Sequence, residues 1–341
     1  MKKNLAIILS FVLALTMLAG CMGTVVVYND CNCTDNAYVP SEGAVKTGLA
    51  IVASAKDSTD AKEAKYDITI AAVTVDDNGV IQDCIIDSVG TSITFDATGT
   101  ITADLTAQIL TKNELGDNYG MKAYGGAKYE WYEQAAALAN YAKGKTLEQL
   151  KNGAIGESGK PTDADLASTA TIYLGGYVSA IEAAVNNAKH LGAQAGDTLK
   201  LAVINSTASS VSATAEKAGL AQLDCDVAAI TAKDDVITSC VLDSVQAKVS
   251  FDTTGKITTD LTAAMQTKTQ LGEAYGMKAW AGAKYEWNEQ AANFATYVTG
   301  KTAAQVAGIA VSEGKPSDAD LAATVTIAIG GFQALIAKAM Q

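Results

Sequence analysis

A long internal repeat dominates this sequence. Residues 119–146 read YGMKAYGGAKYEWYEQAAALANYAKGKT and residues 275–302 read YGMKAWAGAKYEWNEQAANFATYVTGKT, with 20 of 28 positions identical at a constant offset of 156. Solenoid units are only about 20 to 50 residues long, so a repeat of this length indicates a domain with its own core. The chain is therefore expected to carry two copies of any site that the repeat encodes.

The repeat extends on both sides of that block. From Lys160 and Lys315 onward the offset is 155, which aligns PTDADLASTATI with PSDADLAATVTI. We predict two tandem homologous domains, at 45–190 and 198–341, joined by a short linker at 191–197. The matching pairs upstream are Cys84 and Cys240, Asp87 and Asp243, Ser88 and Ser244, Phe95 and Phe251, Asp96 and Asp252, and Gly99 and Gly255.

The N-terminal region carries an export signal. Lys2 and Lys3 precede an apolar run at 5–18, and small residues then lead to Cys21. This order is typical of a secretory signal, and the cysteine makes it resemble the bacterial lipoprotein signal, whose cysteine is lipidated before cleavage. The resemblance implies a signal peptide at 1–20 and a chain held on the extracellular face of the cell membrane through lipid on Cys21.

An uncleaved membrane helix is the weaker alternative, because a span needs about 20 apolar residues and this run is shorter. Residues 21–44 include several Asn and Asp residues together with Pro40 and Gly43, and they have little periodic apolar pattern. They are expected to form a flexible tether between the membrane and the repeats. Several acyl chains on one cysteine are sufficient for stable anchoring.

The charge of the chain argues against a nucleic-acid partner. The formal net charge is -12 and no arginine is present, whereas phosphate backbones require a positively charged stripe. His190 is the only histidine, so histidine-based triads and metal sites are not expected. We predict no catalytic residue and no metal, and we expect His190 on the surface at a helix end.

The cysteine pattern does not indicate a disulfide framework. Cys21 is assigned to lipid, and the five others are an odd number in a chain with ample core. A bridge between Cys225 and Cys240 is disfavoured, because a hairpin turn at 234–235 would leave them out of register by about 13 Å. Cys84 and Cys240 are therefore predicted to be buried apolar positions.

Each repeat has the pattern of strands followed by helices. In the first copy, alternating apolar residues predict strands at 47–55, 66–75 and 80–89. Asn78-Gly79 is the strongest hairpin signal between them. Helical spacing predicts helices at 129–143, 146–152 and 172–190. This order predicts an α+β fold in which an antiparallel sheet precedes the helices of each domain.

The segment most suited to chemistry is 165–171, Asp-Leu-Ala-Ser-Thr-Ala-Thr, just before the last predicted helix. A helix N-terminus offers free amide donors and a positive dipole end to a phosphate. Thr171 would lie at or near that helix cap. Aspartate and threonine before an apolar helix are also ordinary capping residues, so a purely structural interpretation stands beside the phosphate site.

This segment resembles the flavinylation motif of FMN-binding domains. In that motif an aspartate is followed by a hydroxyl residue, a small residue, an alanine and a threonine that accepts FMN through a phosphoester bond. Asp165, Ser168 and Ala170 occupy the acid, hydroxyl and alanine positions. Thr171 occupies the acceptor position, and Thr169 replaces the usual glycine.

The second copy keeps the acid and the acceptor of the motif. Asp320 and Thr326 match these two positions, whereas Ala323, Thr324 and Val325 replace the hydroxyl residue, the glycine and the alanine. The resemblance therefore implies covalent FMN on the acceptor threonine of each repeat, up to two per chain. If only one repeat is modified, we expect the first, whose motif is nearer the family pattern.

Over nearly all of both domains, the chain resembles the two-domain FMN-binding lipoproteins of Gram-positive extracellular electron transfer systems, the pheromone-encoding flavin lipoprotein family. The shared features are YGMK, EWxEQA, a GKT turn and an ADL…TI closing segment. This resemblance implies attachment of FMN by a separate FAD-dependent flavin transferase. It also implies a membrane quinol or NADH dehydrogenase system as electron donor and an extracellular acceptor such as ferric iron. The chain would be a redox carrier whose chemistry the flavin supplies.

For the flavin ring, the repeated block offers aromatic and thioether side chains, which suit an isoalloxazine face. The same side chains at helical spacing are also typical of a core. Lys122 and Lys278 are candidates for pairing with a phosphate or an anionic flavin, with a solvated lysine as the alternative. The ring candidates are Met121, Tyr124, Tyr129 and Trp131 in the first copy and Met277, Trp280, Tyr285 and Trp287 in the second.

A different class of function stays open. The repeats would then belong to a structural or ligand-binding surface lipoprotein without flavin, which Ala323 and Val325 favour. A two-lobed solute-binding lipoprotein is disfavoured, because its α/β lobes do not place all strands before all helices. Retention of yellow colour after denaturation would separate these classes.

Overall fold

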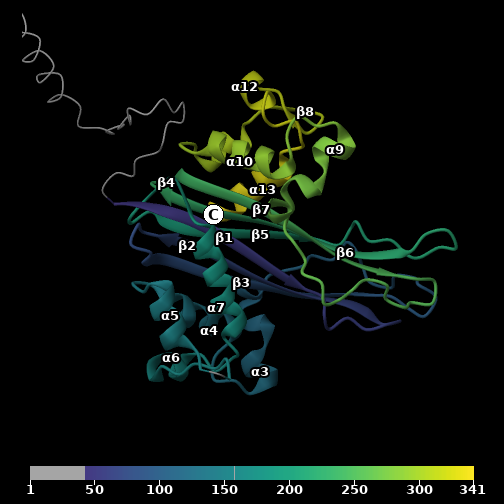
Figure 1. The fold of residues 1–341 in the computed structure, drawn as a ribbon, viewed down its shortest axis with the longest axis horizontal. Coiled ribbons are helices and arrows are strands. Elements are labelled where there is room, and N and C mark those ends of the chain that lie inside the picture. The colour runs from purple at the N-terminus through teal and green to yellow at the C-terminus, as the bar shows by residue number, and fades with distance from the viewer. Residues whose placement is uncertain (1–42, 157) are drawn as a thin grey trace, which may run out of the picture. The chain divides into compact units, whose positions relative to one another are not determined.

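The computed structural model describes residues 43–156 and 158–341. The predicted signal peptide at 1–20, Cys21 and the tether as far as residue 42 lie outside the described residues. Residues 45–341 belong to one compact unit (Figure 1). Within the described ranges, every helix falls short of the length and hydrophobicity that a membrane span requires.

The first repeat folds as an antiparallel meander followed by helices. β1 (Ala44–Ser54), β2 (Glu63–Val75) and β3 (Ile81–Thr94) pair in sequence order, and β4 (Lys189–Gln194) adds to the other edge of β1. The helical part consists of α2 (Lys112–Leu115), η1 (Gly116–Tyr119), α3 (Met121–Gly125), α4 (Trp131–Ala142), α5 (Leu147–Ala154), α6 (Ala164–Thr169) and α7 (Gly175–Asn187).

The second repeat follows the same order. Its sheet consists of β5 (Thr198–Ser206), β6 (Gly219–Lys233) and β7 (Val236–Phe251). The elements after it are α8 (Lys268–Leu271), η2 (Gly272–Tyr275), α9 (Met277–Ala281), α10 (Trp287–Val298), α11 (Ala303–Ala307), β8 (Val311–Ser312), β9 (Lys315–Pro316), α12 (Ala319–Ala322) and α13 (Gly330–Ala339). Antiparallel sheets followed by helices agree with the predicted α+β class.

Both long hairpins turn where the sequence indicates. In the first, Gly79 takes a φ of 77° and the Asp76 carboxylate accepts two backbone N–H groups of the turn, each at 2.9 Å. In the second, Asp234 and Asp235 both have positive φ, as a two-residue type I′ turn requires. These turns set the register of the long central strands.

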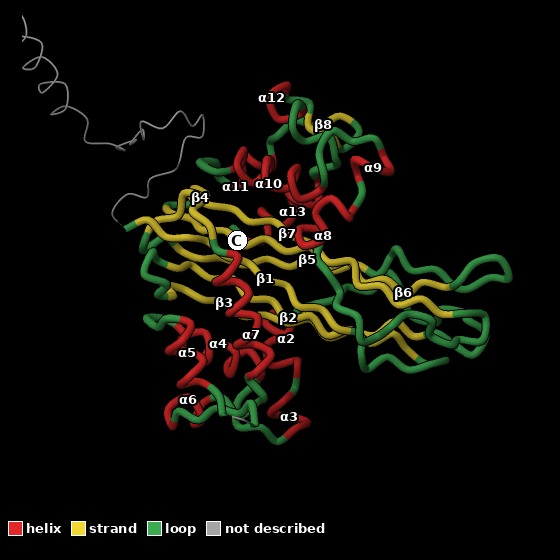
Figure 2. Tube along the Cα trace, viewed as in Figure 1, coloured by secondary structure: helices red, strands yellow, loops and turns green. Residues whose placement is uncertain are grey.

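The two sheets lie face to face, and helices cover their outer faces (Figure 1, Figure 2). α4 and α7 pack on the first sheet, whereas α10 and α13 pack on the second. In β2, Tyr66, Ile68 and Ile70 belong to the cluster between the sheets, and Ala71 and Val73 belong to the cluster under the helices. Where both faces of β2 are covered, at residues 70–73, the strand is continuously apolar, whereas Lys65 and Asp67 nearer its start are exposed.

The two repeats share the core between the sheets. Phe95 and Phe251, which are equivalent in the repeat, stack with ring centroids 4.1 Å apart and an interplanar angle of 1°. The Tyr66 hydroxyl donates to the Ala221 carbonyl at 2.8 Å. Each repeat also has its own cluster beneath its helices. The domain boundaries at 45–190 and 198–341 stay predictions.

Two equivalent glycine turns meet across this shared core. A Cβ atom added at Gly99 would lie 2.6 Å from the Asp252 carbonyl oxygen, and one added at Gly255 would lie 2.4 Å from that of Asp96. Both glycines have positive φ, of 68° and 71°. The close approach of the repeats therefore requires glycine at both turns.

The end of the first repeat differs from the prediction. α7 spans Gly175–Asn187 rather than 172–190, because Ala188 is extended and the chain then pairs with β1 as β4. This pairing satisfies backbone groups that an open sheet edge would leave exposed. His190 therefore lies in a strand rather than at a helix end, half-buried, with Nε2 2.8 Å from Asp77 Oδ1. The expected linker at 191–197 is partly strand.

The described cysteines, Cys84, Cys225 and Cys240, are free and buried. In the β6–β7 ladder, Cys225 lies opposite Val245 and Cys240 lies opposite Ile230. The prediction that Cys225 and Cys240 form no disulfide is confirmed. The prediction that Cys84 and Cys240 are buried is also confirmed.

Candidate functional site

The predicted acceptor of the first repeat lies on the loop between α6 and α7. α6 is capped by Asp163, whose Oδ1 accepts the Leu166 N–H at 3.0 Å, and Asp165 is an exposed residue of its first turn. Ala170 is fully buried and Thr171 beyond it is exposed. Thr171 is thus carried on the surface by a loop that a buried alanine anchors.

The loop does not place Thr171 at the helix cap. The N-cap of α7 is Leu174, three residues later, so the predicted cap position is corrected. The first turn of α7 contains Gly175 and Gly176, and α13 of the second repeat begins with two glycines as well. First-turn N–H groups have no partner within a helix, and neither N-cap side chain supplies one.

A buried glutamine binds the loop from below. Gln134 Oε1 accepts hydrogen bonds from Thr171 N at 2.8 Å, Thr171 Oγ1 at 3.2 Å and Ile172 N at 3.2 Å. Gln134 is fully buried in α4. Its Nε2 donates to the Tyr129 carbonyl at 2.9 Å and lies 3.9 Å from the Met121 sulfur. This one amide joins the acceptor loop to the duplicated aromatic block.

The second repeat has the same arrangement. Gln290 Oε1 accepts from Thr326 N at 2.7 Å, Thr326 Oγ1 at 3.2 Å and Ile327 N at 3.2 Å, and Nε2 donates to the Tyr285 carbonyl at 2.9 Å. Gln290 is fully buried, and Thr326 is exposed. Val325 fills the buried place of the first repeat's alanine. The motif departures of this copy therefore leave the threonine–glutamine geometry intact.

The remaining motif residues belong to short helices. Ser168 Oγ donates to the Asp165 carbonyl at 2.7 Å. In the second repeat, Asp318 caps α12 through the Leu321 N–H at 3.0 Å, and Asp320 is exposed in its first turn. The structure therefore brings the threonines, but not the motif carboxylates, to the buried glutamines.

A buried carboxylate holds the start of α3. The two oxygens of Glu130 accept the Met121 N–H at 2.8 Å and the Lys122 N–H at 2.9 Å, and Glu286 makes the equivalent bonds to α9. The Lys122 ammonium pairs with Glu133 at 2.9 Å, which raises the pKa of Lys122. The first amides of α3 and the lysine beside them are thus already engaged within the protein.

The aromatic ring candidates separate into an exposed, a half-buried and a buried pair. Tyr124 is 93% exposed and Trp280 is 89% exposed, at equivalent positions of α3 and α9. Tyr129 and Tyr285 are half-buried. Trp131 and Trp287 are 2% and 7% exposed and belong to the clusters beneath the helices. The exposed pair is therefore the one most accessible to a ligand or a partner.

The buried tryptophans are engaged in packing. Trp131 Nε1 donates to the Tyr177 hydroxyl at 2.9 Å, and the Lys112 ammonium lies 5.2 Å from the Trp131 ring centroid. In the second repeat, Lys268 lies 4.9 Å from Trp287. These contacts match the core interpretation of the tryptophans and include a cation–π interaction in each copy.

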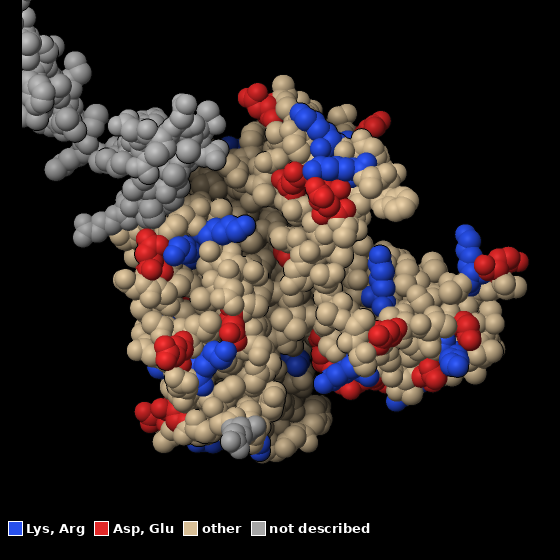
Figure 3. All heavy atoms as spheres, in the orientation of Figure 1, with Lys and Arg blue, Asp and Glu red and all other residues tan. Residues whose placement is uncertain are grey.

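Charged side chains of both signs are interspersed on the face shown in Figure 3. Several of the lysines are paired with acids, among them Lys278, which lies 2.7 Å from Glu289. Lys151 is 2.9 Å from Glu182, and this pair links α5 to α7. The exposed surface is therefore mixed in charge over the elements that the figure displays.

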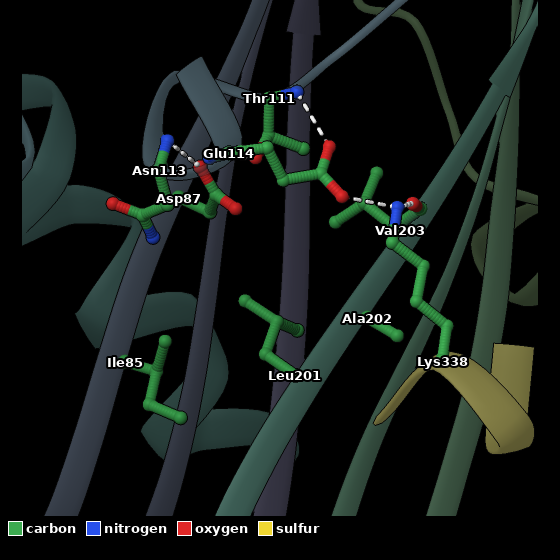
Figure 4. Close-up of a pocket in the computed structure, with 9 residues that line it drawn as sticks. All are labelled: Ile85, Asp87, Thr111, Asn113, Glu114, Leu201, Ala202, Val203 and Lys338. Atoms are coloured by element: carbon green, nitrogen blue, oxygen red, sulfur yellow. Dashed lines mark hydrogen bonds and ion pairs between the residues drawn. The ribbon is translucent and has the colours of Figure 1, made fainter. Parts of the chain in front are cut away.

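A pocket of about 260 Å³ opens where the edge strands β3 and β5 lie side by side (Figure 4). Its lining includes the aliphatic side chains of Ile85, Leu201 and Val203. Glu114 and Lys338 form an ion pair that links the two repeats. None of the flavin-site residues predicted from the sequence lines this pocket.

Asp87 is the buried acid of this pocket. It is 6% exposed, and burial raises the pKa of its carboxyl group to about 6, although hydrogen bonds from the Thr111 side chain and the Ser88 and Asn113 N–H groups oppose the shift. Its equivalent, Asp243, has a raised pKa for the same reason. Burial therefore couples the stability of the fold to pH at both of these carboxyl groups.

Sequence reasoning missed Gln134, Gln290, Glu130 and Glu286. All four are buried polar residues of the EWxEQA segment, identical in both copies. The signal available in the sequence was that these polar residues are the same in both copies of the repeat. Their role was hidden because the acceptor loop lies 37 residues from Gln134 in the first repeat and 36 from Gln290 in the second.

Comparisons of the chain with protein-family models, curated proteins and solved structures found no match. Thr171 and Thr326 are exposed and each carries a hydroxyl group that can form a phosphate ester. The first-turn N–H groups of α7 and α13 begin three to four residues further along the chain, and helix N-termini favour anions.

Proposed function

We propose that this chain is a lipid-anchored extracellular flavoprotein that carries covalent FMN on Thr171 and Thr326. The observation that carries the proposal is the duplicated geometry of the two threonines. Each is exposed on a loop, and each has its hydroxyl and amide groups bound by a buried glutamine at closely similar distances. Two exposed threonines with the same position and the same hydrogen-bond partner in each repeat favour a shared chemical use.

Attachment of FMN would be a phosphoryl transfer catalysed by a separate FAD-dependent flavin transferase. Threonine Oγ1 attacks the phosphorus on the FMN side of FAD, the Oγ1–P bond forms and the pyrophosphate bond breaks. AMP leaves, and the hydroxyl proton passes to a base of the transferase. Bound FMN supplies one- and two-electron redox chemistry. The residues of this chain keep the acceptor exposed and fix its loop.

Covalent attachment suits an extracellular carrier, because a cofactor held by affinity alone would be lost to the medium. The proposed donor is a membrane quinol or NADH dehydrogenase system, and the proposed acceptor is an extracellular oxidant such as ferric iron. Lipid on Cys21 would keep the carrier at the extracellular face of the cell membrane. The chain would then act as a redox carrier between membrane and exterior.

The test is co-expression with an FAD-dependent flavin transferase, followed by intact mass and absorbance of the denatured chain. The wild-type chain should retain two FMN adducts, Thr171→Ala one, and Thr171→Ala with Thr326→Ala none. Thr106→Ala, which removes an exposed threonine outside the acceptor loops, is the matched control and should retain both. An unmodified wild-type chain, or adducts that survive in the double variant, would contradict the proposal.

The alternative is a structural or ligand-binding surface lipoprotein without flavin. The second repeat favours it, because Ala323 and Val325 depart from the flavinylation motif. In that case the threonine–glutamine contacts would serve only to close the loops over the helices. A colourless chain isolated from its own host, unmodified at both threonines, would support this alternative.

A further inference from the structure

The end of α6 and the acceptor loop after it carry three hydroxyl groups within four residues, and these groups differ in what they bind. Ser168 Oγ donates to the Asp165 carbonyl at 2.7 Å, and Thr169 Oγ1 donates to the Leu166 carbonyl at 3.1 Å. Both are therefore tied to the backbone of α6. Thr171 Oγ1 instead donates to the Gln134 side chain at 3.2 Å.

The second repeat repeats this distinction. Thr324 Oγ1 donates to the Leu321 carbonyl at 3.3 Å, whereas Thr326 Oγ1 donates to Gln290 Oε1 at 3.2 Å. In each copy, the hydroxyl that a buried glutamine binds is the one at the acceptor position. The neighbouring hydroxyls use helix carbonyls.

The glutamine remains satisfied when the hydroxyl loses its proton. An amide oxygen has two lone pairs, and Gln134 Oε1 has three donors. Two of these are the N–H groups of Thr171 and Ile172, which remain after an ester forms on Oγ1. Esterification therefore removes the surplus donor and leaves no buried polar atom of Gln134 unpaired.

We propose that Gln134 and Gln290 are positioning residues that select which hydroxyl receives FMN. The bond to Oε1 fixes the rotamer of Thr171 and of Thr326, so that a lone pair of Oγ1 is available to attack phosphorus; as the Oγ1–P bond forms, the hydroxyl proton leaves Oε1 for the base of the transferase. A neutral amide does this without placing a negative charge beside the new phosphate. This inference rests on the proposed function and adds the choice of acceptor within each loop.

The test measures the rate of FMN attachment at each threonine of the full chain, with FAD and purified transferase, by peptide mass mapping. Gln134→Met keeps the length and burial of the side chain but removes the acceptor oxygen. We expect attachment at Thr171 to slow by roughly 10- to 100-fold, the usual result of a misplaced reacting group. Part of the residual adduct should move to Thr169 or Ser168.

Thr326 in the same molecule is the internal control, and its rate should not change. Gln290→Met should slow attachment at Thr326 and leave the rate at Thr171 unchanged. Attachment at Thr171 in Gln134→Met at the wild-type rate would overturn the proposal. Equal slowing at both threonines, with a lowered melting temperature, would also overturn it, because it would assign the effect to folding.

Gln134→Glu provides a second variant with a different readout. A protonated glutamic acid reproduces both functions of the amide, accepting from Thr171 and donating to the Tyr129 carbonyl, whereas an ionised one places a charge beside the phosphate. The ratio of Thr171 to Thr326 attachment should therefore fall as the pH rises. A ratio independent of pH would contradict the role of Gln134.

Different results would refute FMN attachment and the selection of the acceptor hydroxyl by the glutamines. An unmodified wild-type chain would refute the proposed function itself. Two adducts on the wild-type chain, together with unchanged siting and rate in both glutamine variants, would refute only the selection by Gln134 and Gln290.

Discussion

The buried carboxyl group of Asp87 makes the stability of this protein depend on pH in a definite direction. Its pKa rises from 3.8 to about 6 on folding, chiefly because burial disfavours the charged form. The Asp87 carboxyl group is thus a weaker acid in the folded state than in the unfolded state. A shift of this size corresponds to about 3 kcal/mol of unfolding free energy. That contribution is present below about pH 4 and is lost as the pH rises through about 6.

Asp87→Asn removes the titration and keeps the shape of the side chain. The asparagine oxygen can accept the N–H groups of Ser88 and Asn113, as Oδ1 of the aspartate does at 2.7 Å and 3.2 Å. The new amide N–H group can donate to the Thr111 hydroxyl. We expect the variant to match the wild type near pH 4 and to exceed its unfolding free energy by up to about 3 kcal/mol near pH 7.5.

Urea unfolding of both chains across this pH range measures the effect, because the difference between them cancels every group that they share. Asp96→Asn is the matched control. Hydrogen bonds from the Thr98 side chain and from turn N–H groups lower the pKa of Asp96 below its ordinary value of 3.8, so the difference in unfolding free energy between this variant and the wild type should stay constant between pH 4 and pH 7.5. An Asp87→Asn chain less stable than the wild type near pH 7.5, or a difference independent of pH, would refute the burial argument.

Two further predictions concern the contact between the repeats. Phe95→Ala removes one ring of the buried stack with Phe251 and should lower the unfolding free energy by about 3 to 5 kcal/mol; a loss below about 1 kcal/mol in urea unfolding would show that the shared core is not formed as described. Gly99→Ala places a methyl group 2.6 Å from the Asp252 carbonyl oxygen at a φ of 68°. It should cost at least about 1 to 2 kcal/mol, and a neutral result by thermal unfolding would contradict the close approach of the turns.

Local sequence signals predicted much of the architecture. The Asn78-Gly79 turn, the alternating strands and the helix predicted at 146–152, which Thr146 caps in the structure, all depend on residues within a few positions of one another. Local preferences of this kind can be recognised in a sequence because residues close together in the chain satisfy them. The exception was the end of α7, where pairing with β1 overrode the helical pattern that extended to His190.

The candidate site was only partly predictable. The repeat identified Thr171 and Thr326 as equivalent positions. The duplicated segment contains both Tyr124 and Trp131, so the sequence offered both as ring candidates. Burial divided that pair, since one side chain is 93% exposed and the other 2% exposed. Helical spacing alone does not separate them, because the short helix α3 projects from the core against which α4 packs.

The sequence by itself determined that the chain contains two copies of one pattern, in which strands precede helices. It also determined that a threonine occupies the same place in each copy. The tertiary structure decided that the two copies close over a common core, and that Gln134 and Gln290 lie beneath the acceptor loops. The reason is physical: periodicity and capping act over a few residues, whereas the burial of one amide against a loop 37 residues away is settled only when the helices pack on the sheet.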